Sequence, residues 1–108
     1  MADTKIEKII AEISEILKTK YDDFKGIYFF GSRTRGDYRS DSDYDLLFLF
    51  ERKISWEFRE EIRHRIYEYE DTYGVAIDPK IINAKEFEMN RMPFIQNVIR
   101  DGLYYGIW

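Results

Sequence analysis

Two kinds of apolar pattern alternate along the chain, and their order limits the folds that it can adopt. Apolar residues three and four positions apart are typical of amphipathic helices, whereas short runs that are apolar at nearly every position are typical of buried strands. The predicted helices are residues 5–20, 55–73 and 84–101, and the predicted strands are the runs KGIYFFG, YDLLFLFE and VAIDPKII. Ser55 and Gly74 are the expected caps of the second helix, and Pro93 is expected to interrupt the third. This order predicts that residues 1–108 form a single α/β domain.

Composition excludes several classes of protein and of site. The chain has no cysteine, which excludes disulfide bonds and a cysteine-based zinc site. A net charge of −4 argues against binding of nucleic acid through a basic surface. The first residues, MADTKIEKII, lack the apolar core of a signal peptide, and the longest apolar run, LLFLF, is too short to span a membrane. We therefore expect a cytoplasmic protein that contacts neither a membrane nor nucleic acid directly.

The polar segment between the first two predicted strands concentrates charge next to apolar sequence. Gly31 and Ser32 begin the segment, and Asp43 and Asp45 stand at the entrance of the second strand. Side chains alternate along a strand, so Asp43 and Asp45 share one face, where their charges repel and something is expected to compensate them. The segment lacks the Gly-Lys-Ser/Thr of a phosphate loop and the G-x-G-x-x-G of a dinucleotide site. It also lacks the glycine and glutamate that a calcium-binding EF-hand loop requires at its sixth and twelfth positions.

The spacing G-S-x10-D-x-D, formed by Gly31-Ser32 and Asp43-x-Asp45, resembles the signature of the nucleotidyltransferase superfamily related to DNA polymerase beta. Within that superfamily, GSRTRGDYRSDSDYDLLFLF is similar to the minimal nucleotidyltransferases of bacteria and archaea, the MNT proteins. The resemblance extends over nearly the whole chain, since Asp78 lies in the third strand and MPFIQNVIRDGLYYG is similar to the family's C-terminal helix and exit. It implies a small nucleotidyltransferase fold with a mixed, twisted sheet and helices packed mainly on one face.

The resemblance also implies a role for each residue of the motif. The implied catalytic residues and ligands of two Mg²⁺ ions are Asp43, Asp45 and Asp78, of which Asp78 also helps to remove the proton from the attacking hydroxyl. The implied nucleotide-binding residues, which would hold the phosphates of ATP, are Gly31, Ser32, Arg33 and Arg35. Two alternatives remain: Asp78 turns to solvent at a strand end, and the two arginines pair only with nearby aspartates.

The implied reaction is Mg²⁺-dependent transfer of AMP from ATP to a hydroxyl acceptor. Larger relatives grip the acceptor with a helical domain that is not expected here, so a partner or an oligomer, homo- or hetero-, is expected to complete the site. MNT proteins are commonly paired with a helical HEPN protein, a ribonuclease toxin, and some act as antitoxins that adenylylate a tyrosine of that toxin. The alternatives are a non-catalytic antitoxin that covers a HEPN partner, and a small-molecule nucleotidyltransferase. The C-terminal LYYGIW is expected to close the sheet or cover the core, or else to form an apolar patch for a partner.

Overall fold

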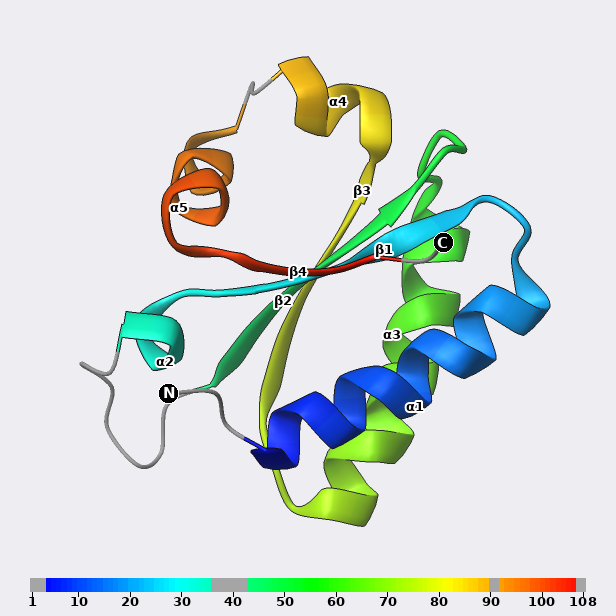
Figure 1. Ribbon diagram of the computed structural model, residues 1–108. Helices are drawn as coiled ribbons and strands as arrows, with labels where there is room; N and C mark the ends of the chain where they lie inside the picture. Colours follow the sequence, from blue (N-terminus) through cyan, green and yellow to red (C-terminus); the bar gives the residue numbers. More distant parts are fainter. Residues whose placement is uncertain (1–3, 36–42, 90–91, 107–108) are drawn as a thin grey trace.

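The computed structural model describes residues 4–35, 43–89 and 92–106, whose helices and strands are shown in Figure 1. In chain order, the elements are α1 (Thr4–Lys20), β1 (Phe24–Phe30), α2 (Ser32–Arg35), β2 (Tyr44–Phe50), α3 (Trp56–Tyr73), β3 (Ile77–Asn83), α4 (Ala84–Met89), α5 (Pro93–Asp101) and β4 (Leu103–Gly106). The interruption predicted before Pro93 is confirmed, because α4 ends at Met89 and α5 begins at Pro93.

The strands of the described residues form one mixed sheet in the order β3-β2-β1-β4. β2 and β3 are parallel, and α3 makes the crossover that a parallel pair requires. β1 is antiparallel to β2 on one side and to β4 on the other. These pairings confirm the predicted mixed sheet. They also show that the C-terminal stretch closes the sheet, since its residues 103–106 form the strand next to β1.

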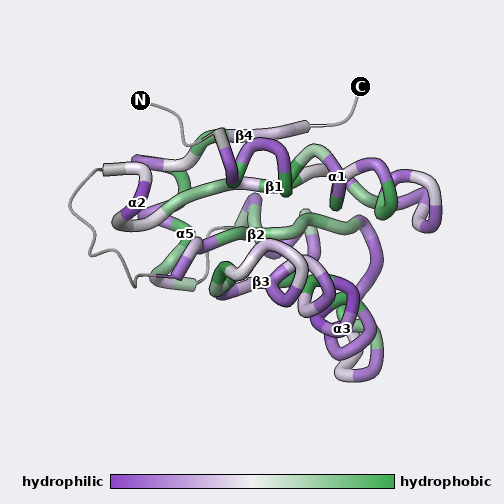
Figure 2. The backbone as a smooth tube through the Cα atoms, turned by 90° about the horizontal axis from the view of Figure 1, so that it is seen from below, coloured by the Kyte–Doolittle hydropathy of each residue, from purple (hydrophilic) through white to green (hydrophobic). Residues whose placement is uncertain are grey.

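Helices cover both faces of the sheet, with the two long helices on one face (Figure 1). The larger apolar cluster lies between the sheet and helices α1 and α3, and it includes Leu46 and Phe48 of β2. The smaller cluster lies between the sheet and helices α4 and α5, and it includes the alternate residues Leu47 and Leu49. Figure 2 shows the corresponding alternation of hydrophobic and hydrophilic residues along α1 and α3, and the mostly hydrophobic course of β2. Each residue of β2 can therefore be assigned to a face by its position in the strand.

Helix α3, which carries the chain from β2 to β3, has the predicted caps. The Ser55 hydroxyl accepts a hydrogen bond from the backbone N–H of Phe58 at 3.1 Å, and Gly74 ends the helix in the left-handed conformation with φ of +64°. The larger cluster holds this helix in place through Phe58, Ile62 and Ile66. Over the part of the chain that the structure describes, no helix combines the length and the apolar character needed to cross a membrane.

Candidate active site

The parallel pairing of β2 and β3 brings two of the predicted aspartates together. Asp45 is the second residue of β2, Asp78 is the second residue of β3, and the register places them directly opposite each other. Both are partly buried, and both lie on the sheet face covered by α4 and α5, because the alternate residues Leu47 and Ile82 belong to the smaller cluster. We call Asp45 and Asp78 the acidic pair. The structure places Asp78 beside Asp45, and its catalytic role stays a prediction.

The carboxyl groups of the acidic pair are partly buried, and this position raises the pKa of Asp45. Burial raises the pKa of Asp45 to about 6, and the negative charge of Asp78 adds to the increase. A hydrogen bond between the two carboxyl groups acts in the same direction, whereas the positive charge of Lys80 acts against it. Below this pKa Asp45 keeps a proton, and above it the negative charge of Asp45 is repelled by that of Asp78. A cation that binds both carboxylates would relieve this repulsion.

The chemistry of the acidic pair fits a hard divalent cation such as Mg²⁺. The pair offers carboxylate oxygens, which Mg²⁺ prefers, and the single histidine of the chain, His64, is exposed on α3. Asp43 is exposed immediately before β2, and its charge is the smallest of the effects that raise the pKa of Asp45. Within residues 4–35, 43–89 and 92–106, no three acidic, histidine or cysteine side chains lie close enough together to hold a metal ion. The structure therefore brings together two of the three predicted metal ligands, Asp45 and Asp78, but does not group Asp43 with them, and the metal-binding role of all three stays a prediction.

Gly31, where β1 ends and α2 begins, lies against the carboxylate of Asp45. A Cβ atom at Gly31 would lie 2.1 Å from Asp45 Oδ2, and the φ of +89° is one that other residues rarely adopt. The Gly31 carbonyl accepts hydrogen bonds from the Thr34 backbone N–H at 3.1 Å and from Thr34 Oγ1 at 2.6 Å. These contacts hold the turn into α2 beside the acidic pair. The structure thus brings together Gly31 and Asp45, the first and the last residue of the G-S-x10-D-x-D spacing.

The other predicted nucleotide-binding residues lie in α2. Ser32 and Arg35 are its first and last residues, but their side chains lie outside the described part of the structure. The guanidinium carbon of Arg33 lies 4.1 Å from the centre of the Tyr44 ring. Tyr44 belongs to the larger cluster, on the face of the sheet opposite to the acidic pair. This contact does not bring Arg33 to the acidic pair, and the nucleotide-binding role of all three residues stays a prediction.

Lys80 is a charged residue of the site that the sequence analysis missed. Its Nζ atom lies 3.2 Å from Asp78 Oδ2 and 3.4 Å from Asp78 Oδ1. The same atom lies 5.9 Å from the centre of the Phe94 ring on α5. A signal for Lys80 was present in the sequence, because residues two apart in a strand share a face, and Lys80 follows Asp78 at that distance.

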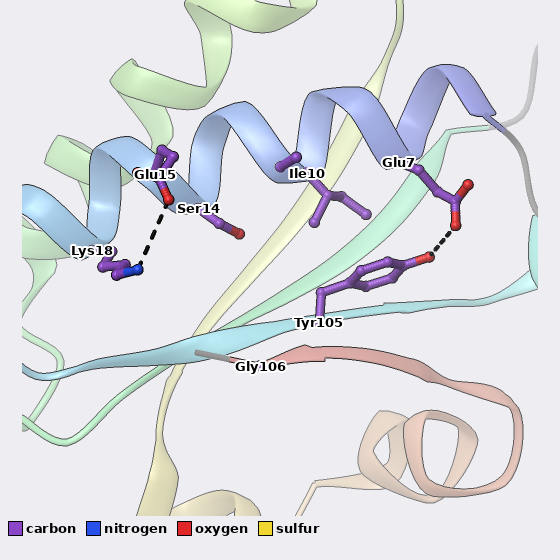
Figure 3. Close-up of a pocket in the computed structure, with 8 residues that line it drawn as sticks. Glu7, Ile10, Ser14, Glu15, Lys18, Tyr105 and Gly106 are labelled. Carbon is purple, nitrogen blue, oxygen red and sulfur yellow. Dashed lines mark hydrogen bonds and ion pairs between the residues drawn. The ribbon is translucent and has the colours of Figure 1, made fainter. Parts of the chain in front are cut away.

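A separate cavity of about 320 Å³ lies between α1 and β4 (Figure 3). Its lining includes Glu7, Ile10, Lys18 and Tyr105, and the Tyr105 hydroxyl donates a hydrogen bond to Glu7 at 3.3 Å. The cavity is on the face of the sheet that α1 covers, whereas the acidic pair is on the face that α4 and α5 cover. It is therefore not part of the candidate active site.

Sequence comparison assigns most of the chain to one family. The family model of the nucleotidyltransferase domain matches residues 10–108. A curated relative from Methanocaldococcus jannaschii, named as a candidate protein adenylyltransferase, is 32% identical over 92 residues, which cover 85% of this chain and 89% of that protein.

Solved structures share the fold. A candidate nucleotidyltransferase from Sulfolobus solfataricus matches with a TM-score of 0.61 and 25% sequence identity, over 97% of this chain and 88% of that chain. A chain from the complex of a tri-AMPylated HEPN toxin with an MNT antitoxin, from Shewanella oneidensis, matches with a TM-score of 0.55 and 18% identity, over 90% of this chain and 69% of that chain. Because the family model matches residues 10–108 and a curated relative is 32% identical over 85% of the chain, the chain belongs to the nucleotidyltransferase domain family and is a nucleotidyltransferase.

Proposed function

We propose that this protein transfers AMP from ATP to a tyrosine hydroxyl of a helical HEPN toxin and thereby acts as the antitoxin of that toxin. The observation that carries the proposal is the acidic pair, set against Gly31 in a member of the nucleotidyltransferase family. A protein acceptor and AMP as the transferred group are supported by the Methanocaldococcus jannaschii relative, which is named as a candidate protein adenylyltransferase. A HEPN toxin as the acceptor is supported by the Shewanella oneidensis structure, in which the toxin is AMPylated and bound to an MNT antitoxin.

The proposed reaction forms one bond to phosphorus and breaks another. The hydroxyl oxygen of the acceptor attacks the α-phosphorus of ATP, the bond from this phosphorus to the oxygen that bridges to the β-phosphorus breaks, and pyrophosphate leaves. The proton of the hydroxyl passes to the carboxylate of Asp78, which acts as the general base. Asp43, Asp45 and Asp78 would hold two Mg²⁺ ions, which when bound supply positive charge at the attacking and leaving oxygens.

Residues around the acidic pair have the proposed task of positioning ATP. Gly31 carries no side chain, and the Asp45 carboxylate lies where its Cβ atom would be. Its proposed task is to let a phosphate approach the backbone of the turn closely. Ser32 would donate its hydroxyl to the β- and γ-phosphates, and Arg33 and Arg35 would add charge-assisted contacts to the triphosphate. For Arg33, this role requires the side chain to leave the Tyr44 ring. With the phosphates held in this way, the α-phosphorus faces the acceptor hydroxyl and Asp78.

The proposal is tested by mass spectrometry of a HEPN protein that is incubated with this protein, Mg²⁺ and each of the four nucleoside triphosphates in turn. We expect the HEPN protein to gain the mass of one or more AMP groups with ATP only, and peptide mapping to find them on tyrosine. Asp45→Asn should abolish the mass gain, because it removes a carboxylate of the acidic pair. The matched control is Asp71→Asn, which removes the charge of an exposed aspartate on α3 and should leave the mass gain unchanged.

Two results would contradict the proposal. If the HEPN protein binds and is inhibited but gains no mass, the protein is a non-catalytic antitoxin. If AMP appears on small hydroxyl compounds and never on the HEPN protein, the protein acceptor is wrong.

A further inference from the structure

Lys80 lies between the acidic pair and the apolar cluster under α5. The register of the parallel strands pairs Lys80 with the fully buried Leu47, in the same way that it pairs Asp78 with Asp45. The Phe94 ring of α5 is the neighbour of its ammonium group on the side away from the sheet. The hydrocarbon part of the lysine therefore lies among apolar residues, and its charged end contacts a carboxylate.

The ammonium of Lys80 contacts the same oxygen atoms that a metal ion would use. Its Nζ atom is 3.2 Å from Asp78 Oδ2 and 3.4 Å from Asp78 Oδ1, so both oxygens of this carboxylate have the same cationic neighbour. In the metal-free protein, Lys80 thus compensates one of the two negative charges of the acidic pair. A divalent cation that arrives at Asp78 is repelled by this ammonium for as long as the contact persists.

We propose that Lys80 is a positioning residue with two alternative contacts. Without metal its ammonium group binds the Asp78 carboxylate, where the metal ion would bind, and when the metal binds the ammonium group moves to the triphosphate of the nucleotide. The inference rests on the proposed nucleotidyl transfer, and it concerns a residue outside the family's G-S-x10-D-x-D motif. A lysine suits both positions, because its long stem carries a compact charge with three hydrogen-bond donors, which can contact a carboxylate or a phosphate. The Lys80 side chain is 35% exposed, which leaves it room to change its orientation.

The proposal predicts opposite effects on metal and on nucleotide when the charge of Lys80 is removed. In Lys80→Met, which keeps an apolar side chain of similar length, Mn²⁺ alone should bind about threefold more tightly, the size expected for loss of one partly exposed ion pair. In saturating Mn²⁺, ATP should bind about tenfold more weakly, because a hydrogen bond to a charged phosphate is lost. Mn²⁺ binding is measured by electron paramagnetic resonance of the free ion, and ATP binding by calorimetry.

Control variants separate this effect from a change in overall charge or in folding. Lys85→Met removes an exposed lysine beyond the other end of β3 and should bind Mn²⁺ and ATP as the unchanged protein does. Lys80→Arg keeps the positive charge and should bind Mn²⁺ with nearly the original affinity. Circular dichroism shows whether each variant is folded, and if Lys80→Met is not, Lys80→Gln takes its place with the same expected effects.

Equal Mn²⁺ affinity of folded Lys80→Met and Lys85→Met would overturn the proposal, because the ammonium would then not compete with the metal. Unchanged or tighter ATP binding by Lys80→Met would also overturn it, because the lysine would then not contact the nucleotide. Failure of the proposed function gives a different result. In that case the unchanged protein binds no Mn²⁺, or the Asp45→Asn variant binds Mn²⁺ as tightly as the unchanged protein does.

Discussion

Asp45→Asn should stabilise the metal-free protein at neutral pH, although it removes a residue of the proposed active site. Burial and the charge of Asp78 raise the pKa of Asp45 from 3.8 to about 6. Folding therefore favours the protonated form of Asp45. Its contribution to the free energy of unfolding is complete below the unfolded pKa of 3.8 and is lost as the pH rises through about 6. The full shift corresponds to about 3 kcal/mol. Because Asp45 is only partly buried and solvent screens its charge, we expect about 1–2 kcal/mol.

The measurement is urea unfolding with a chelator present, at about pH 4 and about pH 7.5. Asn is uncharged and its amide can donate a hydrogen bond to Asp78, as protonated Asp45 does. Asp45→Asn should therefore unfold at higher urea than the unchanged protein at neutral pH and at similar urea in acid, with a melting temperature about 5–10 °C higher at neutral pH. The control Asp71→Asn, at an exposed position, should change the unfolding free energy by less than about 0.5 kcal/mol. No gain for Asp45→Asn at neutral pH, or an equal gain at both pH values, would refute this reasoning.

Three further predictions concern the same site. Gly31→Ala should reduce the unfolding free energy by about 2 kcal/mol more than Gly74→Ala does. Both glycines have positive φ, but only at Gly31 would the new Cβ atom meet another group, the carboxylate of Asp45. Equal losses of unfolding free energy in urea would contradict this prediction. Mg²⁺ with ATP should raise the melting temperature, whereas ATP with a chelator should do so weakly, and equal increases would count against a metal site at the acidic pair. Asp78→Asn should keep most of the affinity for ATP in calorimetry while transfer falls by about a hundredfold or more, and normal turnover would rule out Asp78 as the general base.

Local structure was predictable from local sequence. Ser55 and Gly74 cap α3 as expected, since a hydroxyl that accepts an N–H and a glycine with positive φ act within one turn of the helix. Pro93 begins α5, because proline fits the first turn of a helix but not its interior. Each of these outcomes depends on neighbours in sequence, and a single chain contains that information.

The assembly of the site depends on contacts that the local pattern does not contain. Asp45 and Asp78 meet because β2 and β3 pair in parallel across the whole of α3, and only the family resemblance supported this pairing in advance. The contact of Arg33 with Tyr44 depends on how α2 packs, which no spacing in the sequence specifies. Lys80 was missed for a different reason, because the alternation of side chains was applied to Asp43 and Asp45 in the second strand and not to Asp78 and Lys80 in the third.

The strand order also has a consequence for synthesis of the protein. β1 pairs with β2 soon after the polar segment emerges, but its other neighbour, β4, is the last of the described strands to leave the ribosome. Until then the backbone donors and acceptors of β1 that later pair with residues 103–106 lie along an open edge, beside the aromatic residues Tyr28 and Phe29. An open apolar edge is a template on which a second chain can add a strand. Nascent chains are therefore expected to be most prone to aggregate in the interval between the emergence of β1 and the emergence of β4.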